Sequence, residues 1–169
     1  MEYGYLYVTP NGNQKGILNK VMRDIITFEC VTDFTILVSI KDFSKADEDK
    51  LVEITKNQEF YNKFKKKFNL NCVGIFFIKG TNAISKLKEI ADKYNENSKS
   101  QDKSIRYLDN VYVSNSSKEA IEDVCEYTNC EDFSILESVF DNIEFENKNK
   151  QIYSFNFKAL SEAKNKKLI

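Results

Sequence analysis

One short apolar run in the middle of the chain constrains the fold more than any other feature. Residues Cys72–Ile78 read Cys-Val-Gly-Ile-Phe-Phe-Ile, and Lys79-Gly80 ends the run. The run is too short to cross a membrane, and it is typical of a strand buried in the centre of a sheet. The sequence therefore predicts a sheet with a central strand over residues 72–78.

Amphipathic helices are predicted before and after this strand. Apolar residues recur at helical spacing over residues 14–27 and 81–94, which gives each segment one face to pack on a sheet. Ser44, and Ser116 with Glu119, are residues that cap helices. The predicted elements are strand 3–8, a turn at 9–12, helix 14–27, strand 34–40, helix 46–55, helix 58–68, strand 72–78, helix 81–94, strand 110–114 and a helix from 116.

This order predicts an α+β fold of the ferredoxin-like, split βαβ type, with helices packed on a four-stranded antiparallel sheet. We expect one domain over residues 1–129 and a C-terminal extension over residues 130–169. In the extension, Phe133–Phe140 is expected to be helical, and the alternation in Ile152–Phe157 predicts an edge strand. That strand either packs on its own sheet or adds to a partner.

The chain of 169 residues has no histidine. This excludes serine triads, cysteine–histidine pairs and histidine metal sites. Its cysteines, Cys30, Cys72, Cys125 and Cys130, have no Cys-x-x-Cys spacing, so we predict neither a metal site nor a cofactor. The net charge of −1 gives no overall attraction to nucleic acid or lipid. With no signal peptide and no membrane-length apolar run, we expect a cytoplasmic protein without membrane contact.

Several segments between Tyr5 and Tyr127 resemble the nucleoside diphosphate kinase family. The most specific match sets Lys79-Gly80-Thr81-Asn82-Ala83-Ile84 against the family's Glu-Gly-x-Asn-Ala-Val. The signature Asn-x-x-His-Gly-Ser-Asp-Ser resembles the segment from Asn110 to Ser117. Further matches are Thr9-Pro10-Asn11-Gly12 to the opening turn, Lys15-Gly16 to the helix start, Glu59-Phe60-Tyr61 to Pro-Phe-Phe, and Ser104-Ile105-Arg106 to Thr-Ile-Arg.

The resemblance implies that the family's chemistry is lost. Val113 occupies the position of the histidine that carries the phosphoryl group, and valine offers no lone pair for attack. Thr9 stands where the family has a phosphate-directed lysine, and Ser116 where the signature has its aspartate. We therefore predict a pseudoenzyme with no catalytic residue.

Some nucleotide-facing positions of the family are retained. Phe60 matches the aromatic that stacks on the base, Lys88 and Arg106 match phosphate-contacting cations, and Asn110 matches the ribose-side asparagine. The loop between Arg106 and Asn110 is several residues shorter than in the family. Core packing for Phe60 and solvated surface charge for the cations are the competing interpretations. The alternative function is therefore a regulator that binds ATP or GDP with magnesium without turning it over.

A basic patch provides a candidate partner surface. Phe64 and Phe68 alternate with lysines, a pattern that suits RNA phosphates or an acidic protein and equally suits a solvated helix face. The lysines are Lys63, Lys65, Lys66 and Lys67. The favoured prediction is a binding or scaffolding module in a larger protein assembly or ribonucleoprotein.

Overall fold

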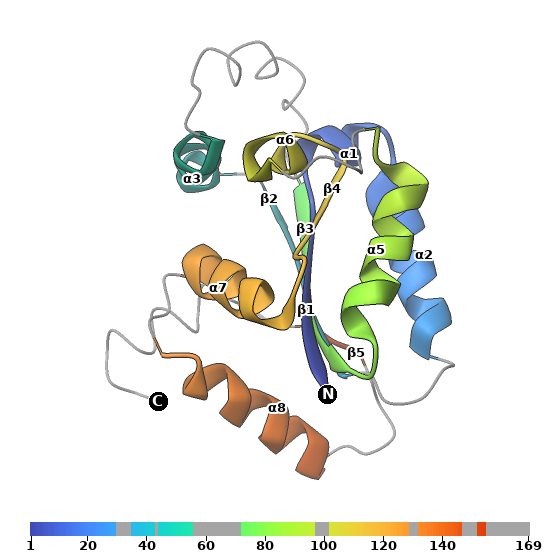
Figure 1. The fold of residues 1–169 in the computed structure, drawn as a ribbon, viewed down its shortest axis with the longest axis vertical. Helices are drawn as coiled ribbons and strands as arrows, with labels where there is room; N and C mark the ends of the chain where they lie inside the picture. Colours follow the sequence, from blue (N-terminus) through green and yellow to red (C-terminus); the bar gives the residue numbers. More distant parts are fainter. Residues whose placement is uncertain are drawn as a thin grey trace.

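The computed structural model describes residues 1–29, 35–42, 44–55, 72–96, 102–128, 132–146 and 152–154, which form one sheet with helices on both faces (Figure 1). The strands are β1 (Glu2–Val8), β2 (Thr35–Asp42), β3 (Cys72–Gly80), β4 (Val111–Val113) and β5 (Ile152–Ser154). The helices are α1 (Pro10–Gln14), α2 (Ile17–Glu29), α3 (Lys45–Thr55), α5 (Ala83–Tyr94), α6 (Lys103–Tyr107), α7 (Ser117–Thr128) and α8 (Ser134–Glu146). In these residues, no helix has the length and apolarity that crossing a bilayer requires.

The strand order is β4-β1-β3-β2-β5. The first four strands are antiparallel to their neighbours, in the order of the ferredoxin-like fold, so the predicted fold class is confirmed. The apolar run is the central strand β3, and its residues Val73–Ile78 are buried. The predicted edge strand at 152–157 is confirmed over Ile152–Ser154, where β5 runs parallel to β2 of its own sheet. Residues 155–157 lie outside the described residues.

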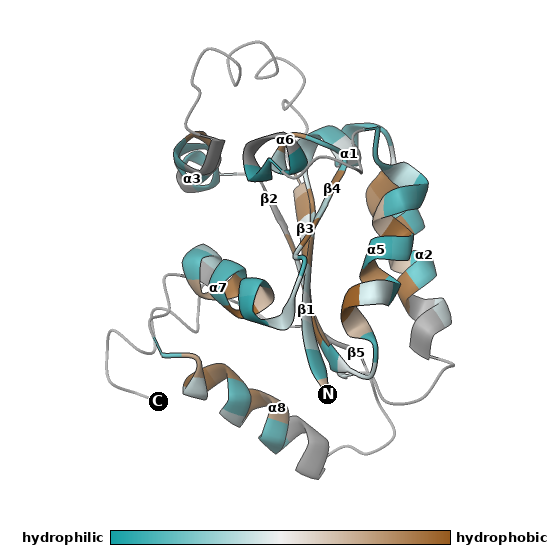
Figure 2. Cartoon of the chain, in the orientation of Figure 1, coloured by the Kyte–Doolittle hydropathy of each residue, from teal (hydrophilic) through white to brown (hydrophobic). Residues whose placement is uncertain are grey.

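The two faces of the sheet carry different cores. On one face, α2 and α5 enclose mainly aliphatic side chains, such as Leu6, Ile25 and Leu87, which we call the α2–α5 core. On the other face, α7 and α8 pack on an aromatic layer, the α7–α8 core. This second core contains Tyr5, Tyr7, Tyr107, Tyr112, Phe77 and Phe140 together with Leu37. Figure 2 shows the hydrophobic stretches along β3 and on the sides of α5 and α8.

The segment expected as an extension contributes to this second core. In α8, Leu136 and Phe140 are almost fully buried, and the Phe140 ring lies 5.6 Å from that of Phe77 in β3. Phe133 meets Tyr3 edge to face with 5.1 Å between ring centroids. The predicted helix at 133–140 is confirmed and continues to Glu146.

The turn predicted at residues 9–12 is wrong, because Thr9–Gly12 forms the start of a helix. Thr9 is the N-cap of α1, its Oγ1 accepts a hydrogen bond from the Gly12 amide at 3.1 Å, and Pro10 is the first helical residue. A Thr-Pro pair suits an N-cap followed by the first helical position as well as it suits a turn. The helix predicted at 14–27 is interrupted at Gly16, whose φ of 74° is left-handed, and α2 begins at Ile17.

The predicted helix caps are present. The Ser44 hydroxyl accepts from the Asp47 amide at 3.3 Å, and the Asp47 carboxylate accepts from the Ser44 amide at 2.9 Å. At the start of α7, Ser116 Oγ accepts from the Glu119 amide at 3.1 Å. Helix α6 was not predicted, and the helix predicted at 58–68 lies outside the described residues.

Candidate functional site

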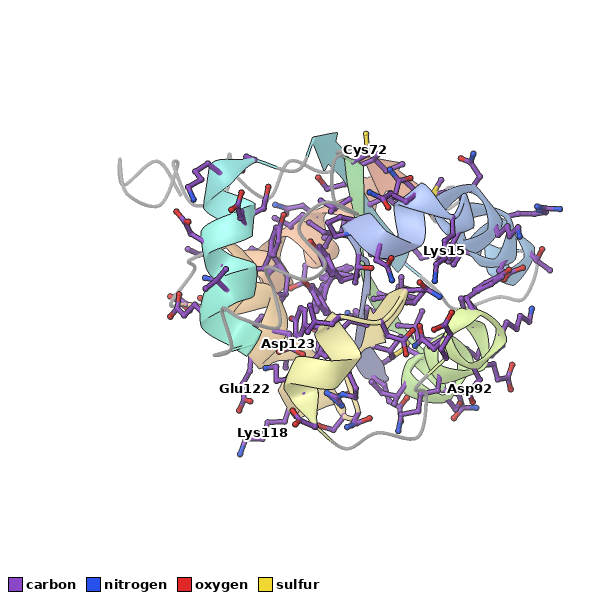
Figure 3. The ribbon with its side chains drawn as sticks, turned by 90° about the horizontal axis from the view of Figure 1, so that it is seen from above. Lys15, Cys72, Asp92, Lys118, Glu122 and Asp123 are labelled. Carbon is purple, nitrogen blue, oxygen red and sulfur yellow. The ribbon has the colours of Figure 1, made fainter. Side chains whose placement is uncertain are left out.

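Helices α6 and α7 and strand β4 bring charged and hydroxyl side chains together beside the α7–α8 core. We call the set the α6–α7 cluster; it consists of Lys103, Arg106, Tyr112, Ser114, Glu119 and Asp123. Its centre is Asp123, whose side chain is fully buried. Figure 3 shows Asp123 pointing into the molecule, whereas Lys118 and Glu122 of the same helix point outward.

Asp123 has partners on both carboxylate oxygens. Its Oδ2 accepts hydrogen bonds from the hydroxyls of Tyr112 and Ser114, each at 2.6 Å. Its Oδ1 accepts from Lys103 Nζ at 2.7 Å, which gives an ion pair with one fully buried member. Burial lowers the pKa of Lys103, but the hydrogen bond and the charge of Asp123 outweigh it, so that the pKa is raised. The carboxylate of Asp123 thus favours the charged form of Lys103.

Arg106 is held by its own contacts inside the protein. Its Nη2 donates to Glu119 Oε1 at 2.6 Å and to the Tyr112 hydroxyl at 3.2 Å, and its guanidinium carbon lies 5.0 Å from the centroid of the Tyr112 ring. The Arg106 side chain is only 11% exposed. Burial and the nearby Asp123 raise the pKa of Tyr112, so its hydroxyl stays protonated and remains a hydrogen-bond donor.

An open hollow of about 420 Å³ lies at the outer side of this cluster. It is lined by Lys103, Arg106, Asn115, Ser116, Lys118, Glu119 and Glu122. Three cations face two carboxylates, and two of those cations already form ion pairs with Asp123 and Glu119. Because the charges nearly balance, the hollow exerts little net attraction on a phosphate group.

Thr9 and Asn110 are buried and make hydrogen bonds within the fold. The Thr9 hydroxyl donates to the Asp109 carbonyl at 2.6 Å while it caps α1. Asn110 Nδ2 donates to the Tyr94 carbonyl at 2.7 Å, and its Oδ1 accepts from Asn11 Nδ2 at 3.1 Å. These side chains join α1, the end of α5 and the start of β4.

Val113 lies in the α2–α5 core. Its side chain is 7% exposed, and it pairs in register with Leu6 of β1. Because side chains alternate along a strand, Val113 faces the aliphatic core while its neighbour Tyr112 faces the aromatic one. The position that resembles the family's histidine therefore carries an apolar side chain in apolar surroundings.

The residues predicted for a nucleotide site do not form one group among the described residues. Lys88 is exposed on α5, the helix that packs on the aliphatic face of the sheet. Arg106 contacts Tyr112 on the opposite face, and Asn110 bonds to Tyr94 and Asn11. Phe60 and the basic patch Lys63, Lys65, Lys66 and Lys67 lie outside the described residues.

The sequence contains a signal for the α6–α7 cluster, although the cluster was not predicted. Tyr112 and Ser114 are two residues apart, so they share one side of the chain at β4, and Glu119 and Asp123 are four apart, so they share one face of a helix. Two hydroxyls followed closely by two carboxylates at these spacings indicate a polar contact between the strand and the helix. Within the described ranges, no three Asp, Glu or Cys side chains gather as a metal site would require.

Comparison with known proteins gives a distant structural likeness. No protein-family model matches the sequence, and no curated protein matches it. Among solved structures, the chain is similar to the nucleoside diphosphate kinase of Aquifex aeolicus, with 20% sequence identity and a TM-score of 0.46. The match covers 75% of this chain and 94% of that one. At this identity and TM-score, neither the family nor the activity of that enzyme is transferred to this chain.

Proposed function

We propose that the protein is a non-catalytic binding module with a nucleoside diphosphate kinase-like fold, which acts within a larger protein or ribonucleoprotein assembly. The observation that carries the proposal is the position of Val113 in the α2–α5 core. A phosphoryl carrier needs a nucleophilic atom that a nucleotide can reach. Val113 has no such atom, and it is packed beside Leu6 and Val111.

The contacts of Thr9 and Arg106 support the same proposal. Thr9 uses its hydroxyl to cap α1 and to hold the Asp109 carbonyl. Arg106 is paired with Glu119 and packed on Tyr112. Both side chains contribute to the fold itself, and a phosphate that approached Arg106 would have to compete with a carboxylate already 2.6 Å away.

The alternative, a regulator that binds a nucleotide without turnover, has less support. To bind a ligand, Arg106 would have to give up its hydrogen bond to Glu119, and Asn110 would have to give up its hydrogen bond from Asn11. Each exchange costs free energy, because Glu119 and Asn11 would lose a partner. The alternative also needs Lys88 of α5 to act together with Arg106, which contacts Tyr112 on the opposite face of the sheet. The basic patch at Lys63–Lys67 is the surface we propose for the partner, and an RNA would meet it through its phosphates.

Two measurements test the proposal. Phosphoryl transfer from ATP to GDP with magnesium is expected to match the buffer blank, and calorimetry with either nucleotide is expected to show no heat of binding up to millimolar concentration. Binding in the micromolar range that Arg106→Ala abolishes would establish the regulator instead. Turnover above the blank would overturn both functions.

The partner surface is tested by charge reversal. We expect a single-stranded RNA of about 20 nucleotides to bind at low salt and to lose about tenfold or more of its affinity when the four lysines of the basic patch become glutamate. The control reverses Lys86, Lys88, Lys93 and Lys118, which changes the net charge equally. An equal loss of affinity in both variants would contradict the assignment of RNA binding to the basic patch. If the protein binds no RNA at all, the proposed partner is a protein.

A further inference from the structure

Strand β4 lies at one end of the sheet, and part of its backbone points away from its neighbour β1. Among the described strands, β4 has a partner on one side only. The amide of Ser114, just after β4, donates to the Tyr5 carbonyl of β1 at 3.1 Å. Bonded and non-bonded positions alternate in an antiparallel pair, so Val111 and Val113 turn their N–H and C=O groups to the outer side. An outward row of this kind is a template to which another chain can add.

The side chain of Asn95 bonds to the outward groups of Val111. Asn95 Nδ2 donates to the Val111 carbonyl at 2.6 Å, and Asn95 Oδ1 accepts from the Val111 amide at 2.8 Å. A neighbouring strand would supply the same pair, one donor and one acceptor, from its backbone. Val111 is only 1% exposed, so these two bonds satisfy backbone groups that water does not reach. The carboxamide therefore takes the place of one residue of a further strand.

Asn95 is held in this position by its neighbours in the chain. It is the C-cap of α5, and its own backbone is extended, with φ −87° and ψ 144°. On one side of it, the Tyr94 carbonyl accepts from Asn110 Nδ2 at 2.7 Å. On the other side, the Glu96 amide donates to Asp109 Oδ1 at 3.1 Å. The carboxamide is thus fixed against β4 before any other strand could approach.

The composition of β4 gives this edge no other protection. Its residues, Val111-Tyr112-Val113, are of the types that favour strands. Soluble proteins often protect an edge strand with charged side chains or proline, and β4 contains neither. Strand β5 at the other end of the sheet shows that a strand of three residues is long enough to join it.

We propose that Asn95 blocks the outer edge of β4 against pairing with the β4 strand of a second copy of the chain. With Asn95 in place, Val113 is the one position of β4 whose outward groups have no neighbour among the described residues, and a single position is too short for a strand. Without Asn95, Val111 and Val113 are both open. A two-fold axis at Tyr112 then sets Val111 of each copy beside Val113 of the other, which is a self-complementary contact.

Hydrogen exchange of the unmodified chain at about 1 µM tests the arrangement without any substitution. We expect the protection factor of the Val111 amide to be at least about tenfold larger than that of the Val113 amide, because only Val111 has an acceptor on the outer side. Equal protection of the two amides would mean that something other than Asn95 covers this edge, and it would overturn the proposal.

Sedimentation velocity of the full chain tests the block itself. Asn95→Ala is expected to double in mass between about 10 and 100 µM, whereas the unmodified chain keeps the mass that it has at 1 µM. Asn95→Asp keeps an acceptor for the Val111 amide but offers its carbonyl no donor, so it is expected to associate more weakly than Asn95→Ala. The control Asn142→Ala, at an exposed position of α8, is expected to behave like the unmodified chain.

A proline identifies the surface through which the variant associates. Val113→Pro removes an outward N–H and no hydrogen bond to β1, so its combination with Asn95→Ala is expected to abolish the added association. Protection of the β3 amides shows that each variant is folded. Folded Asn95 variants that do not associate up to about 100 µM, or an association that survives Val113→Pro, would overturn the proposal.

Discussion

The hydroxyl of Tyr112 and the carboxylate of Asp123 meet at 2.6 Å inside the protein and join the edge strand β4 to helix α7. The same carboxylate oxygen accepts from Ser114, and the other pairs with Lys103 of α6. One buried side chain of α7 thus connects this helix with α6 and β4, and its removal would take an acceptor from Lys103, Tyr112 and Ser114.

The substitution Asp123→Asn is expected to lower the free energy of unfolding by about 2–4 kcal/mol, because it leaves Lys103 and two hydroxyls facing an uncharged amide. Urea unfolding measures the loss. The control Glu122→Gln, on the exposed side of the same helix, is expected to change stability by no more than about 0.5 kcal/mol. Similar losses in the two variants would contradict a central role of Asp123.

At the start of α1, Thr9→Val keeps the shape of the side chain and removes the capping oxygen. We expect a loss of about 1–2 kcal/mol, since the Gly12 amide loses its acceptor and the Asp109 carbonyl loses a donor. Thr9→Ser retains the hydroxyl and is expected to cost less than half as much in the same denaturant titration. Equal losses would mean that the methyl group of Thr9, and not its hydroxyl, stabilises the start of α1.

Two glycines near α1 are expected to respond differently to alanine. A Cβ at Gly12 would overlap the carbonyl oxygen of Asn110, so Gly12→Ala is expected to cost about 3 kcal/mol. Gly16 has open space around it but a φ of 74°, so Gly16→Ala is expected to cost only about 1 kcal/mol of backbone strain. Thermal unfolding of the two variants compares them directly, and the reverse order would refute the close approach of α1 to β4.

Stability is expected to fall above pH 10. Burial and the hydrogen bond to Asp24 raise the pKa of the Tyr94 hydroxyl from its ordinary 10.0 to about 12. Between these two pH values the unfolded chain binds fewer protons than the folded one, so stability decreases as pH rises. Tyr94→Phe should show a shallower decrease over this range in urea midpoints measured from pH 9 to 12. An unchanged slope would exclude Tyr94 as a contributor.

Introducing a histidine at position 113 is not expected to produce phosphoryl transfer. Val113→His places a polar imidazole where the side chain is 7% exposed among aliphatic neighbours, at a cost of about 2–3 kcal/mol. Incubation with radiolabelled ATP is expected to leave the variant unlabelled. Acid-labile labelling of this variant, absent from Val113→Asn, would show that a nucleotide can reach the position and would contradict the proposed loss of function.

The elements that were predicted correctly are those with a local signal. The run Cys72–Ile78 is apolar at every position because β3 is covered on both faces, and Ser44 and Ser116 cap helices through contacts three residues away. Thr9-Pro10 was interpreted wrongly because the same pair suits a turn and a helix start. What fixes the helix start is Asn110, a hundred residues along the chain, whose backbone lies against Gly12.

The α6–α7 cluster was not predicted, although its residues are close in sequence. Whether Tyr112 faces Asp123 or the opposite side depends on the register of β4 against β1, in which Tyr112 lies beside Tyr7. A slip of one residue would turn Tyr112 towards α5 and Val113 towards Asp123. Sequence spacing predicts which side chains share a face, but it does not predict which face is turned to the helix.

The position of β1 between β4 and β3 has a consequence for biosynthesis. Strand β1 is synthesised before both strands that it pairs with, at residues 72–80 and 111–113, so neither neighbour is present while the roughly sixty residues after β1 are made. Contacts of such long sequence separation slow folding and leave apolar strands exposed to chaperones and to other nascent chains. Tyr5 to Val8 are almost fully buried in the finished protein. If translation pauses or terminates before their partner strands are made, the exposure of this segment should have the greatest effect on solubility.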